Sequence, residues 1–163
     1  MPFYQIEHST PLIRPQRNAL ALAITTIHTR KFATPSLFVN VRFTDSGDHV
    51  NYVGGKECTS MNRVLAYVRS GGSRSKADFD DMALKIQAAW DEIVGTGPEE
   101  RLTRVLVLGA ITSGLESGFV LPEAGKDVSW LKENMARFEE RAEKGDEEFV
   151  ELVREMRERE DLQ

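Results

Sequence analysis

Hydrophobic and polar residues follow two different periods along this chain. Residues 1–8 have the character of a β-strand. From Arg14-Pro15 to about residue 31, apolar side chains recur at helical spacing, and a proline suits the first turn of a helix. Ser36 to Phe43 alternates apolar and polar side chains. The opening part of the chain therefore predicts a strand, a helix and a second strand.

The same order is predicted a second time. Asn62 to Arg69 is a strand candidate, and Ser75-Lys76-Ala77-Asp78 resembles a helix capping box with Asp in its last position. An amphipathic helix follows and stops at Gly95-Thr96-Gly97-Pro98. Leu102 to Ile111 is a further strand, whose apolar residues on both faces predict a central position in the sheet.

Two βαβ units in tandem, about residues 1–56 and 57–125, predict a single α/β (α+β) domain that spans residues 1–163. Because βαβ crossovers join parallel strands with one hand, two such units give a four-stranded mixed sheet with two helices on one face. Nothing in the first 120 residues can cover the other face, so self-association is the simplest expectation. A helical C-terminal extension, about 126–163, adds charged helices that we expect to be solvated.

Composition excludes several classes of function. The net charge is −5 and no basic tract is interleaved with aromatics, which argues against a nucleic-acid partner. No apolar run approaches the roughly 20 residues that span a bilayer, and no signal-peptide pattern opens the chain. Cys58 is the only cysteine, so we expect a cytoplasmic protein without a disulfide or metal site. Gly71-Gly72 lacks the Lys-Ser/Thr of a phosphate-binding loop, and no cofactor is predicted.

The second residue is a candidate for catalysis. If Met1 is trimmed, Pro2 becomes a free secondary amine at the start of a strand. An α-amino group titrates near ~7.7–8.0, and burial or a neighbouring cation lowers that pKa. Pro2 is therefore a candidate general base or nucleophile. Taken alone, the Met-Pro dipeptide is also a common start of a protein.

Four further polar residues are candidates for a site. His28 lies near the end of the first predicted helix, where a lone histidine is also a common surface or capping group. Arg69 and Arg74 flank a glycine-rich loop, and two such arginines can fork onto a carboxylate. Glu116 lies in a loop after the last strand, where functional residues are frequent but glutamates are usually only solubilising.

Together these residues resemble a known family. The chain resembles the tautomerase superfamily, specifically its fused, double-length subgroup typified by cis-3-chloroacrylic acid dehalogenase. The resemblance runs from Pro2 to about Trp130 and depends on the order and spacing of several short motifs. They are Met1-Pro2-Phe3-Tyr4, Ala23 to His28, Arg69 to Ser75, Glu116, Phe119, and Leu121-Pro122 through Gly125.

The resemblance implies a tautomerase/MIF-like fold, a homotrimer with its sheets facing inward, and a role for each candidate residue. It implies that Pro2 is the acid or base, that Arg69 and Arg74 hold a small carboxylate substrate, and that His28 helps to bind and polarise it. In members that hydrate their substrates, the residue matching Glu116 activates water. A tautomerase also needs cations that stabilise a developing enolate, which the arginines would supply.

The chain departs from the dehalogenase pattern in three places. Val107 stands where that pattern has a tyrosine beside the water-activating glutamate. Ser70 to Ser73 separates the arginines more widely, and the loop from Gly109 to Glu116 is shorter. Loss of the tyrosine weakens the case for hydrolytic dehalogenation or hydration, and the looser arginine pair indicates weaker or different carboxylate recognition. Proline-dependent tautomerisation needs neither feature.

The sequence therefore predicts a proline-dependent keto–enol tautomerase of small 2-oxo or enol carboxylic acids. A hydratase, dehalogenase or decarboxylase of unsaturated or 3-oxo acids is an alternative, with Pro2 as acid and Glu116 handling water. Two non-enzymatic alternatives also stay open: a cytokine-like trimeric binding protein with a vestigial site, and a dimeric α+β-barrel binding module.

Overall fold

A computed structural model describes residues 2–163. Its centre is a four-stranded sheet whose members are β1 (Phe3–His8), β2 (Asn40–Asp45), β5 (Asn62–Tyr67) and β6 (Leu102–Leu108). Their order is β2-β1-β5-β6. β1 and β2 are parallel, as are β5 and β6, whereas the central pair β1 and β5 is antiparallel. The sheet therefore joins two βαβ halves through their first strands and is mixed, as predicted.

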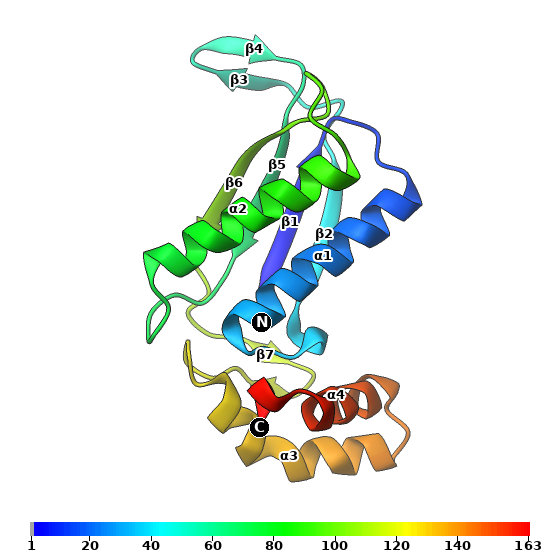
Figure 1. Ribbon diagram of the computed structural model, residues 1–163, viewed down its shortest axis with the longest axis vertical. Helices are drawn as coiled ribbons and strands as arrows, with labels where there is room; N and C mark the ends of the chain where they lie inside the picture. The colour runs from blue at the N-terminus through cyan, green and yellow to red at the C-terminus, as the bar shows by residue number, and fades with distance from the viewer. Residues whose placement is uncertain (1) are drawn as a thin grey trace.

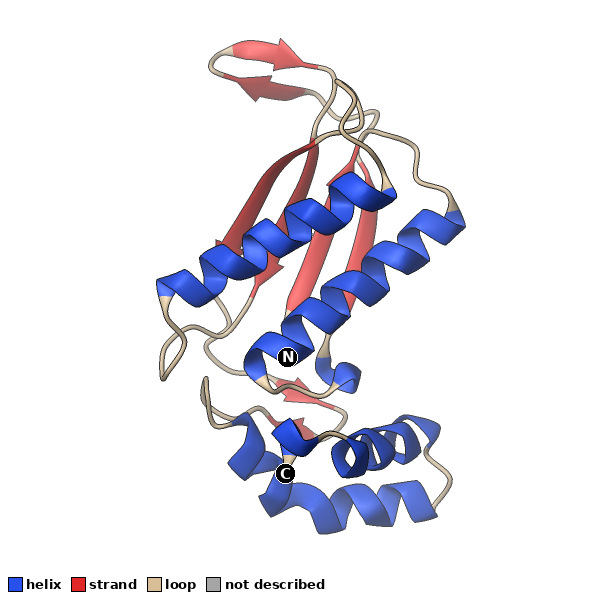
Figure 2. Cartoon of the chain, viewed as in Figure 1, coloured by secondary structure: helices blue, strands red, loops and turns tan. Residues whose placement is uncertain are grey.

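Two long helices, α1 (Arg14–Phe32) and α2 (Lys76–Ile93), lie side by side on one face of the sheet (Figures 1 and 2). α1 begins with a proline in its first turn. α2 begins with the predicted capping box: the Asp78 backbone N–H donates to Ser75 Oγ at 3.2 Å, and the Ser75 backbone N–H donates back to Asp78 Oδ2 at 2.9 Å. The predicted two-helix layer is confirmed.

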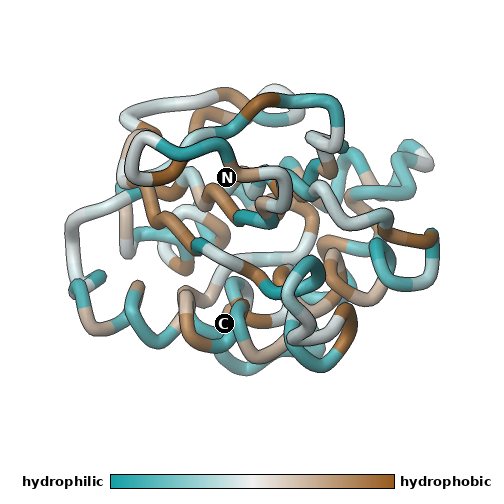
Figure 3. Tube along the Cα trace, turned by 90° about the horizontal axis from the view of Figure 1, so that it is seen from above, coloured by the Kyte–Doolittle hydropathy of each residue, from teal (hydrophilic) through white to brown (hydrophobic). Residues whose placement is uncertain are grey.

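The first hydrophobic core lies between these helices and the sheet. Tyr4 and Ile6 on β1 point into it, as do Val64 and Ala66 on β5, and all four are completely buried. The trace coloured by hydropathy alternates hydrophobic and hydrophilic segments along the elements (Figure 3). Residues of opposite parity lie on the other face, which none of the helices in residues 2–163 covers.

Two details of the predicted strands are wrong. Ser36 to Phe38 is a 3₁₀ turn, η1 (Ser36–Phe38), and the strand starts only at Asn40. Pro35 precedes the turn, and Phe38 leaves the ladder to pack into a second core. β6 is an edge strand rather than a central one. Its apolar residues on both faces reflect one face packed on α2 and one face left open, where Leu106 is 44% exposed.

The remaining elements form two groups at opposite ends of the sheet (Figure 1). A hairpin of β3 (Asn51–Val53) and β4 (Lys56–Cys58) projects from one end. At the end where β1 begins lies a second hydrophobic core around Phe138 and Phe149. The elements of this second group are β7 (Leu115–Glu116), β8 (Phe119–Val120), α3 (Asp127–Glu143), α4 (Glu147–Glu158) and η2 (Glu160–Leu162). No helix within residues 2–163 is long and apolar enough to cross a membrane.

Candidate active site

The sequence candidates meet at one end of the sheet. Asn40, Phe3, Tyr67 and Leu108 form a row across the four strands at that end. Pro2 comes directly before this row, is buried, and accepts a hydrogen bond of 3.1 Å from the Asn40 backbone N–H through its carbonyl oxygen. The predicted removal of Met1 concerns a residue outside the described part of the chain and stays a prediction.

Asn40 connects Pro2 to the carboxylate of Glu116. Its side-chain Nδ2 donates to Glu116 Oε1 at 2.9 Å. Burial raises the pKa of the Glu116 carboxyl, and the hydrogen bond from Asn40 opposes that rise. The second oxygen, Oε2, is buried and meets no hydrogen-bond partner within residues 2–163. Glu116 is therefore a half-buried acid with one free acceptor near the start of β1.

His28 lies deeper, between the sheet and the helices. It is 1% exposed, and its Nδ1 shares a hydrogen bond of 2.7 Å with Tyr4 Oη. Burial and the nearby charge of Arg74 lower the pKa of His28 to about 3. The imidazole is therefore neutral near pH 7. The imidazole ring also packs against the ring of Phe32, with ring centroids 4.9 Å apart.

Arg69 and Arg74 converge on a third charged residue, Asp127. Arg69 Nη2 donates to Asp127 Oδ1 at 2.5 Å, and Arg74 Nη2 donates to Oδ2 at 2.7 Å. All three side chains are at most 7% exposed. The Arg74 guanidinium also lies over the ring of Phe32, 4.7 Å from its centroid. The two predicted arginines therefore do come together, but on a carboxylate that the chain itself supplies.

The loop between the arginines packs on the segment that leads into α3. Gly72 has φ +61°, and a Cβ built on it would lie 2.2 Å from the carbonyl oxygen of Ala124. Arg69 Nη1 also donates to the carbonyl of Pro122 at 2.5 Å. The wider spacing of the arginines seen in the sequence thus accommodates a close loop–loop contact.

The structure also gives the position of Val107, the departure from the dehalogenase pattern. Val107 is on β6 and packs against the first core. Glu116 is held by Asn40 on β2, at the opposite edge of the sheet. Three strand spacings of about 4.8 Å separate these edges. Within one chain, residue 107 therefore does not lie beside Glu116.

Sequence reasoning missed two residues of this site, Asn40 and Asp127. Asn40 is a polar residue at the start of a half-buried strand, a weak signal by itself. Asp127 is the first residue of α3, and an acidic residue in a first turn is commonplace. Among residues 2–163, no three His, Cys, Asp or Glu side chains are grouped to hold a metal ion.

Solved structures share this fold at low sequence identity. A member of the cis-3-chloroacrylic acid dehalogenase family called N1 is 24% identical, with a TM-score of 0.65 over 80% of this chain and 90% of that one. A protein of the thermophilic fungus Aspergillus fumigatus is 22% identical, with a TM-score of 0.62 over 82% and 94%. A fused 4-OT protein, solved as an asymmetric trimer, is 12% identical, with a TM-score of 0.59 over 72% and 94%.

No curated protein matches the chain in sequence. A family model does match, over residues 1–135, and its family is described as "Putative oxalocrotonate tautomerase enzyme". This match covers most of the chain, including both βαβ units and the start of α3. The chain therefore belongs to that tautomerase family and is a member of the tautomerase superfamily that resembles cis-3-chloroacrylic acid dehalogenase.

Proposed function

We propose that this protein is a keto–enol tautomerase of small 2-oxo or enol carboxylic acids, with Pro2 as general base after removal of Met1. The observation that carries the proposal is the gathering of Pro2, Glu116 and the two arginines at one end of the sheet, joined in part through Asn40. An acid–base group and fixed cations are the parts that proton transfer between carbon and oxygen requires.

The two arginines favour a neutral Pro2 amine, and the Glu116 carboxylate opposes them. Arg69, Arg74 and Asp127 leave their cluster with a net charge of about +1, which lowers the pKa of a nearby amine, whereas Glu116, joined to Pro2 through Asn40, raises it. A free amine with a pKa below its usual ~7.7–8.0 is unprotonated in a large fraction of molecules at neutral pH. In this proposal Pro2 removes the proton, and the arginines stabilise the enolate charge that develops.

The test is turnover of phenylenolpyruvate by the purified protein, after mass spectrometry shows that Met1 is absent. Pro2→Ala should lose at least about 100-fold in kcat/KM, the usual contribution of a general base. Pro11→Ala is the matched control, because Pro11 is exposed in the turn after β1. Equal activity in the two variants, or none in the unsubstituted protein, overturns the proposal.

Glu116 supports hydration or dehalogenation of an unsaturated acid as a second candidate. Its raised pKa and its free oxygen are properties of a group that exchanges a proton with water. Glu116→Gln keeps the acceptor for Asn40 and removes the proton-transfer group. Loss of 3-chloroacrylate turnover by about 100-fold or more, with phenylenolpyruvate turnover changed far less, would support this second activity. Equal effects on both substrates would contradict it.

We also propose that the protein assembles as a homotrimer through the open face of the sheet. On that face Phe3 and Tyr67 pack together, with ring centroids 6.0 Å apart, and Leu106 is 44% exposed on β6. An apolar sheet face without a cover favours association. The trimeric state of a fused 4-OT neighbour supports the number three. Light scattering coupled to size-exclusion chromatography measures the mass, and a monomer at micromolar concentration would overturn this assignment.

A further inference from the structure

Asp127 makes the contacts that a bound carboxylate would make. Its Oδ1 accepts from Arg69 at 2.5 Å and its Oδ2 from Arg74 at 2.7 Å, and Oδ1 also accepts a longer hydrogen bond of 3.5 Å from the Thr34 hydroxyl. Arginine pairs recognise carboxylates in this way, because guanidinium N–H groups match the two oxygens. Asp127 comes from a segment that follows the sheet, so it reaches the arginines from outside the βαβ units.

The arginines are held by groups other than Asp127. Arg69 Nη1 donates to the carbonyls of Pro122 and Glu123, at 2.5 and 3.3 Å. Arg74 Nη1 donates to the Arg69 carbonyl at 3.3 Å, and its guanidinium lies over Phe32. Loss of the Asp127 contact would therefore leave both guanidinium groups oriented toward the same point. A pair fixed in this way is ready for another carboxylate.

Solvent reaches this cluster from one side. A pocket of about 400 Å³ is lined by Arg74 and Asp127, together with the cations Arg30 and Lys31 and the carboxylates Asp78 and Asp161. A second, inner cavity of only about 10 Å³ is lined by Asp127 and Arg69 and by second-core residues such as Phe38 and Leu131. A small anion can therefore approach from the pocket, whereas the inner cavity has room for about one water molecule.

We propose that Asp127 is an internal competitor for the carboxylate site, which a substrate carboxylate displaces together with the first turn of α3. This inference rests on the proposed role of Arg69 and Arg74 in holding the substrate carboxylate. Asp127 then sets specificity, because only a ligand that outcompetes a tethered carboxylate binds. The apparent Kd of any ligand is its intrinsic Kd divided by the fraction of molecules in which Asp127 has left the arginines. The apparent affinity is therefore lower the longer Asp127 stays in place.

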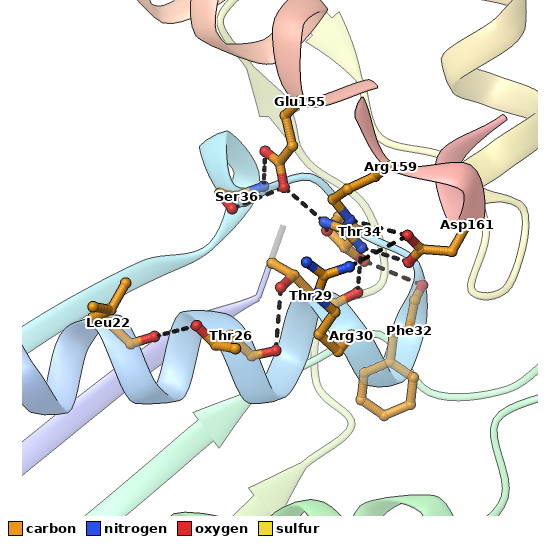
Figure 4. Close-up of polar contacts among 10 residues, drawn as sticks. All are labelled: Leu22, Thr26, Thr29, Arg30, Phe32, Thr34, Ser36, Glu155, Arg159 and Asp161. Atoms are coloured by element: carbon orange, nitrogen blue, oxygen red, sulfur yellow. Dashed lines mark hydrogen bonds and ion pairs between the residues drawn. The ribbon is translucent and has the colours of Figure 1, made fainter. Parts of the chain in front are cut away.

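The helices α3 and α4, together with η2, form a C-terminal helical hairpin. The part of this C-terminal hairpin that follows the first turn of α3 has a separate attachment, which allows such a local movement. Arg159 is buried and donates to the backbone carbonyls of Thr29 and Thr34, at 3.0 and 3.2 Å (Figure 4). It also pairs with Glu155 and Asp161. These contacts hold α4 and η2 against the end of α1 without Asp127. Release of Asp127 therefore displaces the first turn of α3 and not the rest of α3 and α4.

The test measures binding of pyruvate, a 2-oxo acid with one carboxylate, by isothermal titration calorimetry. Asp127→Asn should bind pyruvate at least about fivefold more tightly than the unsubstituted chain, the lower end of usual coupling energies. Asp146→Asn makes the same chemical change in an aspartate that pairs with Arg141 and does not line the pocket, and it should alter the affinity less than twofold. Adding Arg74→Leu to Asp127→Asn should remove the gain.

Hydrogen exchange on the unsubstituted protein gives a second readout that needs no stable variant. Saturating pyruvate should increase exchange of the first-turn amides of α3, within residues 127–131. Unchanged affinity in a folded Asp127→Asn variant overturns the inference, as does unchanged or slower exchange in that turn. Asp127 would then have a structural role only.

The same titrations in the Pro2→Ala background separate this inference from the proposed catalytic role. A gain in affinity on Asp127→Asn that persists there supports the competitor role even if Pro2 proves dispensable for turnover. Loss of turnover in Pro2→Ala without any gain from Asp127→Asn would instead overturn the competitor role and leave the proposed catalysis intact.

Discussion

Tyr4 and His28 share a buried hydrogen bond, with Tyr4 Oη 2.7 Å from His28 Nδ1. Burial raises the pKa of the Tyr4 hydroxyl and lowers that of His28 to about 3, so both groups are neutral across the physiological range. The pair therefore acts inside the core as a neutral link between β1 and α1. A direct electrostatic role for His28 toward a substrate would require the imidazole to gain a proton that its surroundings disfavour.

This relationship predicts a pH-dependent stability. In the unfolded chain His28 binds a proton below about pH 6.5, whereas in the folded protein it does so only near pH 3. Stability is therefore lost as the pH falls through that window, by about 2 kcal/mol between pH 7 and pH 5. Urea unfolding at both pH values measures this loss. Between pH 7 and pH 5 the His28→Gln variant should lose about 2 kcal/mol less stability than the unsubstituted protein. Equal losses in the two proteins would contradict the assignment.

Glu116 predicts a dependence of the opposite sign. Its folded pKa is raised by burial, so the carboxyl contributes stability that is present at low pH and is lost as the pH rises through the folded pKa. Glu116→Gln should therefore gain stability relative to the unsubstituted protein as the pH increases from 4 to 7.

Asn40→Ala removes the hydrogen bond that opposes the rise in the pKa of Glu116, and NMR titration should then show a still higher pKa for that carboxyl.

Much of the fold is predictable from the sequence because its determinants are local. The Ser75–Asp78 capping box lies within one turn, and the alternation in β1 and β5 directly reflects one buried and one open face. The position of β6 at an edge is not local, because an open apolar face and a buried one have the same sequence pattern.

The site shows the same division between local and distant determinants. Arg69 and Arg74 are recognisable from the sequence because they flank one short glycine-rich loop. The partner of both arginines, Asp127, lies more than fifty residues away and is brought to them by packing of the loop at Gly72 on Ala124. The 3₁₀ turn before β2 has a similar origin, since Phe38 packs into a core built mostly from residues of the C-terminal hairpin. No pattern near residue 38 reports on that distant core.

Gly72 predicts a measurable cost for the loop–loop contact. Gly72→Ala puts a side chain at φ +61° and a Cβ 2.2 Å from the Ala124 carbonyl oxygen. Gly54 has nearly the same φ, +59°, and open space around its Cβ position. Gly54→Ala should cost only the backbone strain, about 1–3 kcal/mol, and Gly72→Ala clearly more. Chemical denaturation compares the two, and equal costs would show that the loop moves aside freely.

Arg159 predicts that the C-terminal hairpin depends on one buried cation. Arg159→Ala leaves Glu155, Asp161 and two backbone carbonyls without their shared donor. Because Asp161 is 39% exposed and Glu155 keeps its hydrogen bonds from Ser36, the loss comes mainly from the buried carbonyls and is about 1–3 kcal/mol. Arg157→Ala is the control, because Arg157 is 65% exposed and pairs only with Glu139 among the described residues, a contact worth about 0–1 kcal/mol. Thermal unfolding followed by circular dichroism measures both, and a similar midpoint for the two variants would contradict the prediction.

Leu106 offers the sharpest test of the proposed trimer, because it lies on the open face of the edge strand β6. Leu106→Glu would bury a carboxylate among the apolar side chains of an inward-facing sheet, and an unpaired buried charge is strongly unfavourable. We expect this variant to be monomeric and folded by light scattering and circular dichroism. Leu84→Glu, on the outer face of α2 where Leu84 is 71% exposed, should leave the trimer intact. A trimer that tolerates Leu106→Glu must be built through another surface, and the open face would then need a different explanation.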